Sequence, residues 1–287
     1  MINEVLQTAK VTVSQQHSGL QVFGLQWPMS PMLVYSTLDE AMSAGTLDVT
    51  EVSAEGRVPE LKVESRSDVM TFLMAGEQFL GAKQNRVLNV SLMVGAHTAL
   101  SVPVSCVEAG RWRPRSAKFA SGGTMSHGIM RKMISRHVRE SYRQTGAPSA
   151  NQGEIWDEVR RKLDALASMS PSQEFDQVYK DYRTPLEDLL RELTPPAGCH
   201  GAVFAVGGKI NPAVSRAHGV RAPRTSCPPA KFAGTIRSFP AYLGNPIAKD
   251  CFNRRIVRRV PAGSRRSGRR PSSRAPRDGC LRPVPEC

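Results

Sequence analysis

The densest group of potentially reactive side chains lies in one short segment, residues 76–86. Within it stand a carboxylate, three carboxamides, an ammonium and a guanidinium: Glu77, Gln78, Lys83, Gln84, Asn85 and Arg86. Arg86 could bind a phosphate or carboxylate with two parallel hydrogen bonds, Lys83 could supply a point charge, and Glu77 could act as a base. The alternative is a solvated loop, because polar loops between strands are common.

A second candidate segment covers residues 105–112. Here Glu108 could pair with the cations of residues 76–86, and Trp112 could offer a face on which a planar ring stacks. In the alternative interpretation Cys106 is a small buried apolar residue, Glu108 and Arg111 form a surface pair, and Trp112 anchors a core.

A third, weaker segment covers residues 152–158, where Gln152 and Glu154 are polar and Trp156 can pack on a sheet. Glu154 is equally explained as a partner of Asn151 in capping a helix. From the three segments we predict catalytic groups at Glu77, Lys83 and Glu108, and ligand-binding groups at Gln78, Gln84, Asn85, Arg86, Arg111, Trp112, Gln152 and Glu154.

Common catalytic motifs are absent from the sequence. It has no paired-histidine zinc motif, no Gly-x-Ser-x-Gly elbow and no dinucleotide-binding glycine fingerprint, and its six histidines are scattered. We therefore predict no metal and no cofactor, and the residues alone leave open whether the chain is an enzyme.

The elements that must position these segments change type along the chain. Alternating or continuous apolar residues predict strands near residues 11–13, 20–22, 32–35, 49–52, 61–63 and 69–74. Residues 88–94 and 100–106 alternate around a four-residue loop and predict a β-hairpin, with Pro103 at an edge or a bulge.

The second half is predicted to be mainly helical. A short earlier helix is expected after Thr37, with Glu40 completing a capping box. One helix is expected from the helical spacing of Met125, Ile129, Met133 or Ile134, and Val138. A second should run from Asn151 to about Ser168, a third should begin at Ser170 and a fourth at Thr184. One returning strand is expected after them, at residues 201–206. This order predicts an α+β fold with a mostly antiparallel N-terminal sheet.

The net charge of +14 lies entirely in the last part of the chain. Residues 211–287 hold 17 Lys and Arg against 3 Asp and Glu, with 11 Pro and no apolar periodicity, whereas the first 210 residues have 22 of each sign. We predict one domain over residues 1–210 and a disordered basic tail over residues 211–287. The two body cysteines lie far apart, and no signal peptide or long apolar span is evident, so a cytoplasmic protein without membrane contact is expected.

Several runs of the sequence match a known family. They are Leu38-Asp39-Glu40-Ala41, Val49-Thr50-Glu51-Val52, Val58-Pro59-Glu60-Leu61, Gly76-Glu77-Gln78, Gly81-Ala82-Lys83-Gln84-Asn85-Arg86, the run from Pro103 to Trp112, and the run from Gln152 to Val159. Over residues 19–210 the chain resembles the ARG and Rhodanese-Phosphatase-superfamily-associated domain family, in which ARG stands for ADP-ribosylglycohydrolase. The resemblance implies a role near NAD or ADP-ribose metabolism but no assigned reaction.

The resemblance also implies a closing helix after Ile210, and this sequence departs from it there. One hypothesis is a frameshift near codon 210; the rival is a genuine tail that binds nucleic acid. For function, the first hypothesis is binding or processing of an ADP-ribose-like or other phosphate-bearing nucleotide. The second is a non-catalytic domain that scaffolds partner enzymes, and the third is nucleic-acid binding through the tail.

Overall fold

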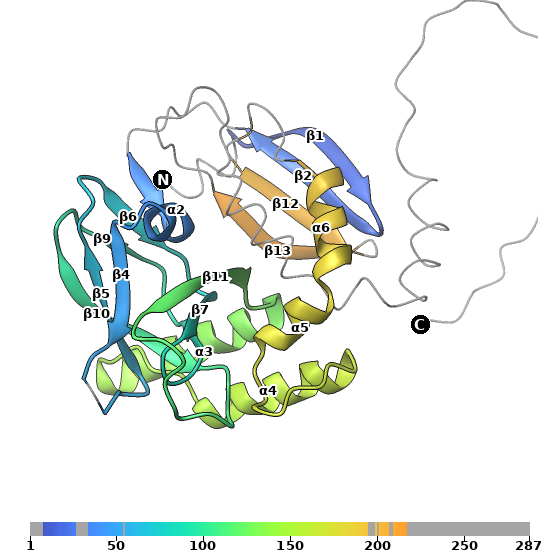
Figure 1. Ribbon diagram of the computed structural model, residues 1–287. Helices are drawn as coiled ribbons and strands as arrows, with labels where there is room; N and C mark the ends of the chain where they lie inside the picture. Colours follow the sequence, from blue (N-terminus) through green and yellow to red (C-terminus); the bar gives the residue numbers. More distant parts are fainter. Residues whose placement is uncertain are drawn as a thin grey trace, which may run out of the picture.

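The chain is described by a computed structural model that covers residues 8–26, 34–53, 55–194, 199, 201–206 and 209–216. It is an α+β structure with three sheets and a group of helices (Figure 1). The predictions for residues 217–287 lie outside the described residues.

The first sheet joins the two ends of the domain. Its order is β1-β2-β12-β13 and all its pairs are antiparallel, with bounds β1 (Lys10–His17), β2 (Leu20–Gln26), β12 (Gly201–Val206) and β13 (Lys209–Arg216). The expected returning strand at residues 201–206 is confirmed, but a second strand follows it and continues beyond Ile210 to Arg216. β12 is largely buried, which explains why its apolar residues are nearly continuous, whereas β2 is buried at alternate positions, as its alternating sequence predicts.

The second sheet carries the candidate segments. Its order is β11-β7-β8-β10-β5-β4, again antiparallel throughout, with bounds β4 (Leu47–Glu51), β5 (Glu60–Ser65), β7 (Glu77–Gly81), β8 (Arg86–Leu88), β10 (Ala99–Cys106) and β11 (Phe119–Met125). In β10, pairing with β5 ends at Pro103 and pairing with β8 begins at Val104. Pro103, which has no N–H to donate, thus stands where the strand changes partner, in agreement with its predicted edge position.

The predicted hairpin of residues 88–94 and 100–106 is wrong. Residues 88–94 divide between β8 and β9 (Leu92–Val94), and β9 belongs to a third sheet of order β3-β6-β9, with β3 (Tyr35–Thr37) and β6 (Met70–Leu73). Asn89 breaks the strand: its N–H bonds Pro103 O, and its buried Oδ1 accepts from Ser105. The apolar residues of the pattern do pack into one core, but its strands pair in two different sheets.

The helices are α2 (Leu38–Ser43), α3 (Gly128–Thr145), α4 (Gln152–Ala165), α5 (Asp176–Asp181) and α6 (Arg183–Glu192). The capping box of Thr37 and Glu40 and the Asn151 cap are confirmed. The expected face of α3 is correct in part. Ile134 is buried, and Met133 and Val138 pack against the first core, but Ile129 is 60 % exposed, and the buried Met130 and His137 were not expected. The reason is that the helix begins only at Gly128, and Met125 ends a strand instead.

The expected helix from Ser170 begins later, at α5. Glu174 forms an isolated antiparallel bridge with Glu108, and Phe175 N–H bonds Val107 O at 2.8 Å, so these residues pair with the second candidate segment before the helix starts. The new helix near Pro185 is confirmed as α6, although Tyr182 rather than Thr184 occupies its N-cap. Pro185 lies in the first turn, where its missing N–H has no intrahelical partner to lose.

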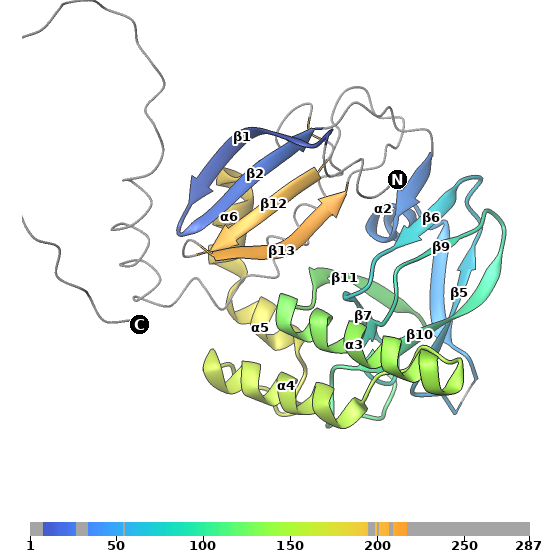
Figure 2. The same ribbon diagram turned by 180° about the vertical axis from the view of Figure 1, so that it is seen from behind.

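Two apolar cores hold these layers together. One lies between the first sheet and the helices, where α6 covers one face of the sheet (Figures 1 and 2). The other lies among α2 and the strands of the second and third sheets. Val87 and Val107 belong to the first core and Leu88 to the second, so β8 and the end of β10 stand between the two.

Within the described part of the chain, no helix is long and apolar enough to cross a membrane.

Candidate functional site

The site is built on the tight connection between β7 and β8. Gly81 has φ 118°, and a Cβ there would stand 2.5 Å from Ser116 Oγ, so glycine is required. Ala82 follows at φ 39°, a left-handed conformation, and its N–H donates to Ser116 Oγ at 3.0 Å. These two residues turn the chain so that residues 84–86 point inward. All three are buried, which rules out a solvated loop.

Arg111 and Glu108 hold this connection in place. Arg111 donates through Nε and Nη2 to both carboxylate oxygens of Glu108, at 2.8 and 2.6 Å. Its remaining donors reach the carbonyls of Gly81, Ala82 and Arg113. Both side chains are at least 95 % buried, so this is a buried pair and not the surface pair of the alternative interpretation.

The charge of Glu108 is stabilised despite its burial. Burial by itself would raise the pKa of Glu108, but hydrogen bonds from Arg111, the Asn85 N–H and Ser172 outweigh it and lower the pKa. Since its oxygens already accept from Arg111 and from Asn85 at 3.0 Å, the carboxylate serves the loop rather than an outside proton.

Asn85 extends the network to a residue that the sequence did not indicate. Its Nδ2 donates to Glu174 Oε2 at 3.2 Å, and its Oδ1 accepts from the Gly81 N–H at 3.0 Å. Glu174 is buried and also pairs with Arg115 at 3.2 Å and Lys180 at 2.7 Å. No sequence signal marked the contact of Glu174 with Asn85 or with Arg115, because these partners are 89 and 59 residues away.

Arg86 is the least satisfied group of the site. Its side chain is 0 % exposed, and Nη1 donates to Gln84 Oε1 at 3.0 Å and to Cys106 Sγ at 2.7 Å. Its Nε and Nη2 have no hydrogen-bond partner in the part of the chain that the structure describes. A buried guanidinium with two unpartnered nitrogens is costly, and such groups are rare.

Glu51, Lys83 and Trp112 surround Arg86. Glu51 Oε1 lies 3.9 Å from Arg86 Nη2, and Glu51 Oε2 is buried without a partner among the described residues. The Trp112 ring centroid lies 5.7 Å from Arg86 Cζ and 5.4 Å from Lys83 Nζ, within the range of a cation–π contact. Trp112 is 48 % exposed and therefore does not anchor a core. Glu51 lies in a run that carries the family resemblance, but nothing else indicated it.

Cys106 is not suited to nucleophilic attack. Its Sγ donates to Gln84 Oε1 at 3.0 Å, and burial raises the pKa of the thiol to about 11 although Arg86 is adjacent. At neutral pH the group is a neutral thiol, and the thiolate is the nucleophilic form.

Of the third segment, only Gln152 reaches the site. Its side-chain amide pairs with the backbone of Cys106, accepting from N–H at 2.8 Å and donating to O at 2.8 Å. It thereby continues the hydrogen bonding of β10 at its end. Glu154 instead pairs with His137 at 2.9 Å and Arg136 at 3.1 Å on α3.

Glu77 and Gln78 lie toward the far end of β7. Gly81 follows Glu77 by four positions along the strand, or roughly 13 Å at the usual rise. Glu77 accepts from the Met74 N–H at 2.7 Å, and Gln78 donates to Thr124 Oγ1 at 2.7 Å. The structure therefore does not bring Glu77 to Lys83 and Glu108.

The arrangement as a whole is a buried guanidinium and a partly exposed ammonium beside an exposed aromatic ring, with one carboxylate next to them. Among the described residues, no group of three or more His, Cys, Asp or Glu side chains could hold a metal ion. Arg86 and Lys83 can neutralise an anion, Trp112 can stack on a planar ring, and Glu51 can accept a hydrogen bond from a hydroxyl.

Comparison with known proteins gives one match. The family model described as the ARG and Rhodanese-Phosphatase-superfamily-associated Protein domain matches residues 8–213. No curated protein and no solved structure matches the chain.

Proposed function

We propose, since the chain belongs to the ARG and Rhodanese-Phosphatase-superfamily-associated Protein domain family, that it binds a phosphate-bearing nucleotide of the ADP-ribose or NAD kind at Arg86. The observation that carries the proposal is the wholly buried Arg86 guanidinium, whose Nε and Nη2 have no hydrogen-bond partner among the described residues, although Nη2 lies 3.9 Å from Glu51 Oε1. The edge of a guanidinium that bears Nε and Nη2 presents two parallel N–H bonds, which is the geometry that phosphate oxygens accept.

Trp112 and Lys83 support the nucleotide part of the proposal. The half-exposed indole has room to stack on a base, and Lys83 lies against the same ring with its charge near the phosphate position. Glu51 Oε2 would accept from a ligand hydroxyl. Because Arg86 has no exposed surface, the ligand reaches it only when Lys83 and Trp112 shift outward, and both side chains are at least partly exposed.

The roles of the other candidates follow from their partners. We assign Glu108, Arg111, Asn85 and Gln152 to positioning the loop, because their polar groups already bind one another or the backbone. Gln84 holds Arg86 through its Oε1. Among the carboxylates, Glu51 is the one best placed to act on a bound ligand.

The test is a thermal-shift screen of the full chain with NAD, ADP-ribose, ADP and pyrophosphate. A ligand should raise the Tm, and Lys83→Ala, Arg86→Lys and Trp112→Ala should each reduce that rise. Arg86→Lys keeps the charge but loses the two-pronged geometry. Lys118→Ala is the matched control, since Lys118 is an exposed lysine that pairs with Asp48.

The variants separate the possible outcomes. Stabilisation by pyrophosphate that depends on Arg86 but not on Trp112 would indicate a phosphate site without a base. A ligand shift that survives in all three variants would remove this site from the proposal. Absence of any shift with all four compounds would contradict nucleotide binding itself.

We also propose a cytoplasmic location and a frameshift origin for residues 211–287. A frameshift near codon 210 predicts that another reading frame of the downstream DNA encodes a helix. Translation of both alternative frames is the test, and two frames without helical periodicity would reject the frameshift.

A further inference from the structure

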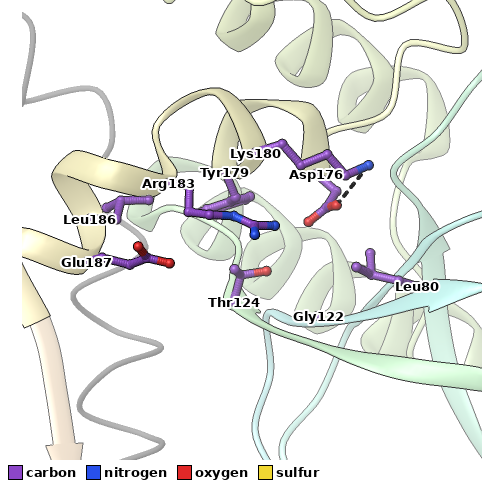
Figure 3. A pocket seen from close by; sticks show the side chains of 9 residues that line it. All are labelled: Leu80, Gly122, Thr124, Asp176, Tyr179, Lys180, Arg183, Leu186 and Glu187. Atoms are coloured by element: carbon purple, nitrogen blue, oxygen red, sulfur yellow. Dashed lines mark ion pairs between the residues drawn. The ribbon is translucent and has the colours of Figure 1, made fainter.

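A cavity lies beside β7, and Arg86 is not among the residues that line it. It has a volume of about 340 Å³ and lies between the β7–β11 edge of the second sheet and helices α5 and α6. Figure 3 shows Leu80 and Thr124 from the strands facing Asp176, Lys180, Arg183 and Glu187 from the helices. The volume is in the range of small-molecule sites. None of the groups assigned to the nucleotide lines this cavity.

The charged groups of the cavity balance one another. Lys180 and Arg183 contribute two positive charges, and Asp176 and Glu187 two negative ones. Lys180 Nζ is already paired with Asp176 at 3.2 Å and with Glu174 at 2.7 Å. A phosphate or another anion would have to approach two carboxylates as well as the cations. The balance therefore favours a ligand without net charge.

Unused hydrogen-bonding capacity of both kinds faces this space. Arg183 and Glu187 are exposed, and neither has a hydrogen bond or ion pair with a residue that the structure describes. In Figure 3 the Arg183 guanidinium extends between Thr124 and Asp176. Thr124 Oγ1 accepts from Gln78, so its own proton remains for another acceptor.

Two buried acceptors at or next to the cavity add to this hydrogen-bonding capacity. Asp176 is 95 % buried, and burial raises its pKa although Lys180 lowers it, so its carboxylate lacks part of the solvation it has in water. Gln78, which adjoins the cavity residues Gly122 and Thr124, is fully buried and its Oε1 has no partner among the described residues. Such groups gain most from an added hydrogen-bond donor.

We propose that this cavity binds a neutral polyhydroxylated molecule of the sugar or sugar-alcohol class. A hydroxyl donates and accepts at once, so it can receive a bond from Arg183 and give one to Asp176 or Glu187. Leu80 and Leu186 supply apolar surface for the carbon skeleton. The inference is independent of the nucleotide proposed at Arg86, because the two sites share no ligand-contacting residue.

The experiment is a titration of the isotopically labelled full chain, followed by backbone amide NMR. D-Ribose, D-glucose and sorbitol are the probes, with glycine and sulfate as charged comparisons. A few hydrogen bonds support Kd values of about 1 to 100 mM, so the titration spans that range. We expect the sugars to shift the amide signals of Gly122, Thr124 and Arg183.

Variants decide whether the cavity is responsible. Thr124→Val and Arg183→Ala should weaken sugar binding at least about tenfold together, by loss of two hydrogen bonds. Arg191→Ala should leave it unchanged, since Arg191 lies further along α6 and pairs with Asp188. Sugar shifts that persist in the double variant would overturn the proposal. So would shifts caused by glycine or sulfate alone, or none up to about 100 mM sugar.

Discussion

Replacing Arg86 by methionine should leave the domain as stable as before or make it more stable, whereas the same replacement at Arg111 should destabilise it strongly. The two arginines are in the same network, and both are buried, at 0 % and 5 % exposure. They differ in how completely their donors are used. Arg111 is satisfied on all sides, and Arg86 uses only Nη1.

The magnitudes follow from that difference. An unsatisfied buried polar group costs about 1–3 kcal/mol, and Arg86→Met removes two such nitrogens while losing bonds worth about 0.5–3 kcal/mol each. Gln84 Oε1 keeps its bond from Cys106 Sγ at 3.0 Å, so the replacement leaves that acceptor partnered. At the midpoints of these ranges the gain is about 4 kcal/mol and the loss about 3.5 kcal/mol, so the free energy of unfolding should be unchanged or rise by less than about 1 kcal/mol. Arg111→Met removes the two close bonds to the buried Glu108 and leaves it only the longer 3.6 Å ion pair with the half-exposed Arg115 and the Asn85 N–H, which costs about 3–5 kcal/mol.

Urea denaturation followed by circular dichroism measures both variants. Equal m-values would show that the comparison concerns stability and not a change of the unfolded state. Arg66→Met is the control, because Arg66 is a half-exposed arginine paired with Asp48 and should cost less than about 1 kcal/mol. The reasoning would be refuted if Arg86→Met lost as much stability as Arg111→Met. In that case Arg86 would be a structural residue, and its unpartnered nitrogens would not indicate a ligand.

Four further predictions concern other parts of the domain. Acid should destabilise it: Glu158 has its pKa lowered from 4.5 to about 2 against burial by bonds from His127 and Arg161, and burial lowers the pKa of His127. Both groups contribute stability above their unfolded pKa values. As pH falls, the contribution of His127 is lost from about pH 6.5 and that of Glu158 from about pH 4.5 toward 2. Glu158→Gln should therefore reduce the pH dependence of the free energy of unfolding, measured by urea denaturation, by at most about 3 kcal/mol, and an unchanged pH dependence would contradict this. Gln152→Ala should lower the free energy of unfolding by about 1–3 kcal/mol, because it leaves the Cys106 backbone unpaired. Gln177→Ala removes only a surface bond to Asp181 and should cost little, so equal losses of stability in the two variants would argue against the Gln152 contact. Cys106, with its pKa raised to about 11, should resist iodoacetamide at pH 8 in the native chain and react in urea, as peptide mapping would show; rapid native labelling would be the contrary result. Asn151→Ala should lower stability by about 1 kcal/mol through loss of the α4 cap, and Asn151→Ser should restore it in the same denaturation assay.

Local signals in the sequence were sufficient for much of the fold. The capping box at Thr37 and Glu40 and the Asn151 cap depend on residues two or three positions apart, so their chemistry is visible in the chain. The same holds for the α+β class, because strand and helix periodicities are local properties. The division of net charge between the first 210 residues and the rest was likewise readable directly.

The pairing of distant segments could not be predicted from the sequence. Residues 88–94 alternate as one strand would, but Leu88 packs in a sheet with β10 and Leu92 in a sheet with β6, and alternation carries no information about partners. Similarly, nothing local distinguishes the exposed Ile129 from the buried Met130, because the face of α3 depends on where the helix starts.

The candidate site likewise has features that the sequence predicts and features that depend on the tertiary structure. Its polar composition, from Lys83 to Arg86, was evident from the sequence, and so was the presence of Glu108 and Arg111 nearby. Which of these groups are already satisfied depends on partners that fold in from far away, such as Glu51, Glu174 and Gln152. A side chain becomes available to a ligand only if tertiary structure leaves its hydrogen bonds unused, and for that reason only the structure separates Arg86 from Arg111.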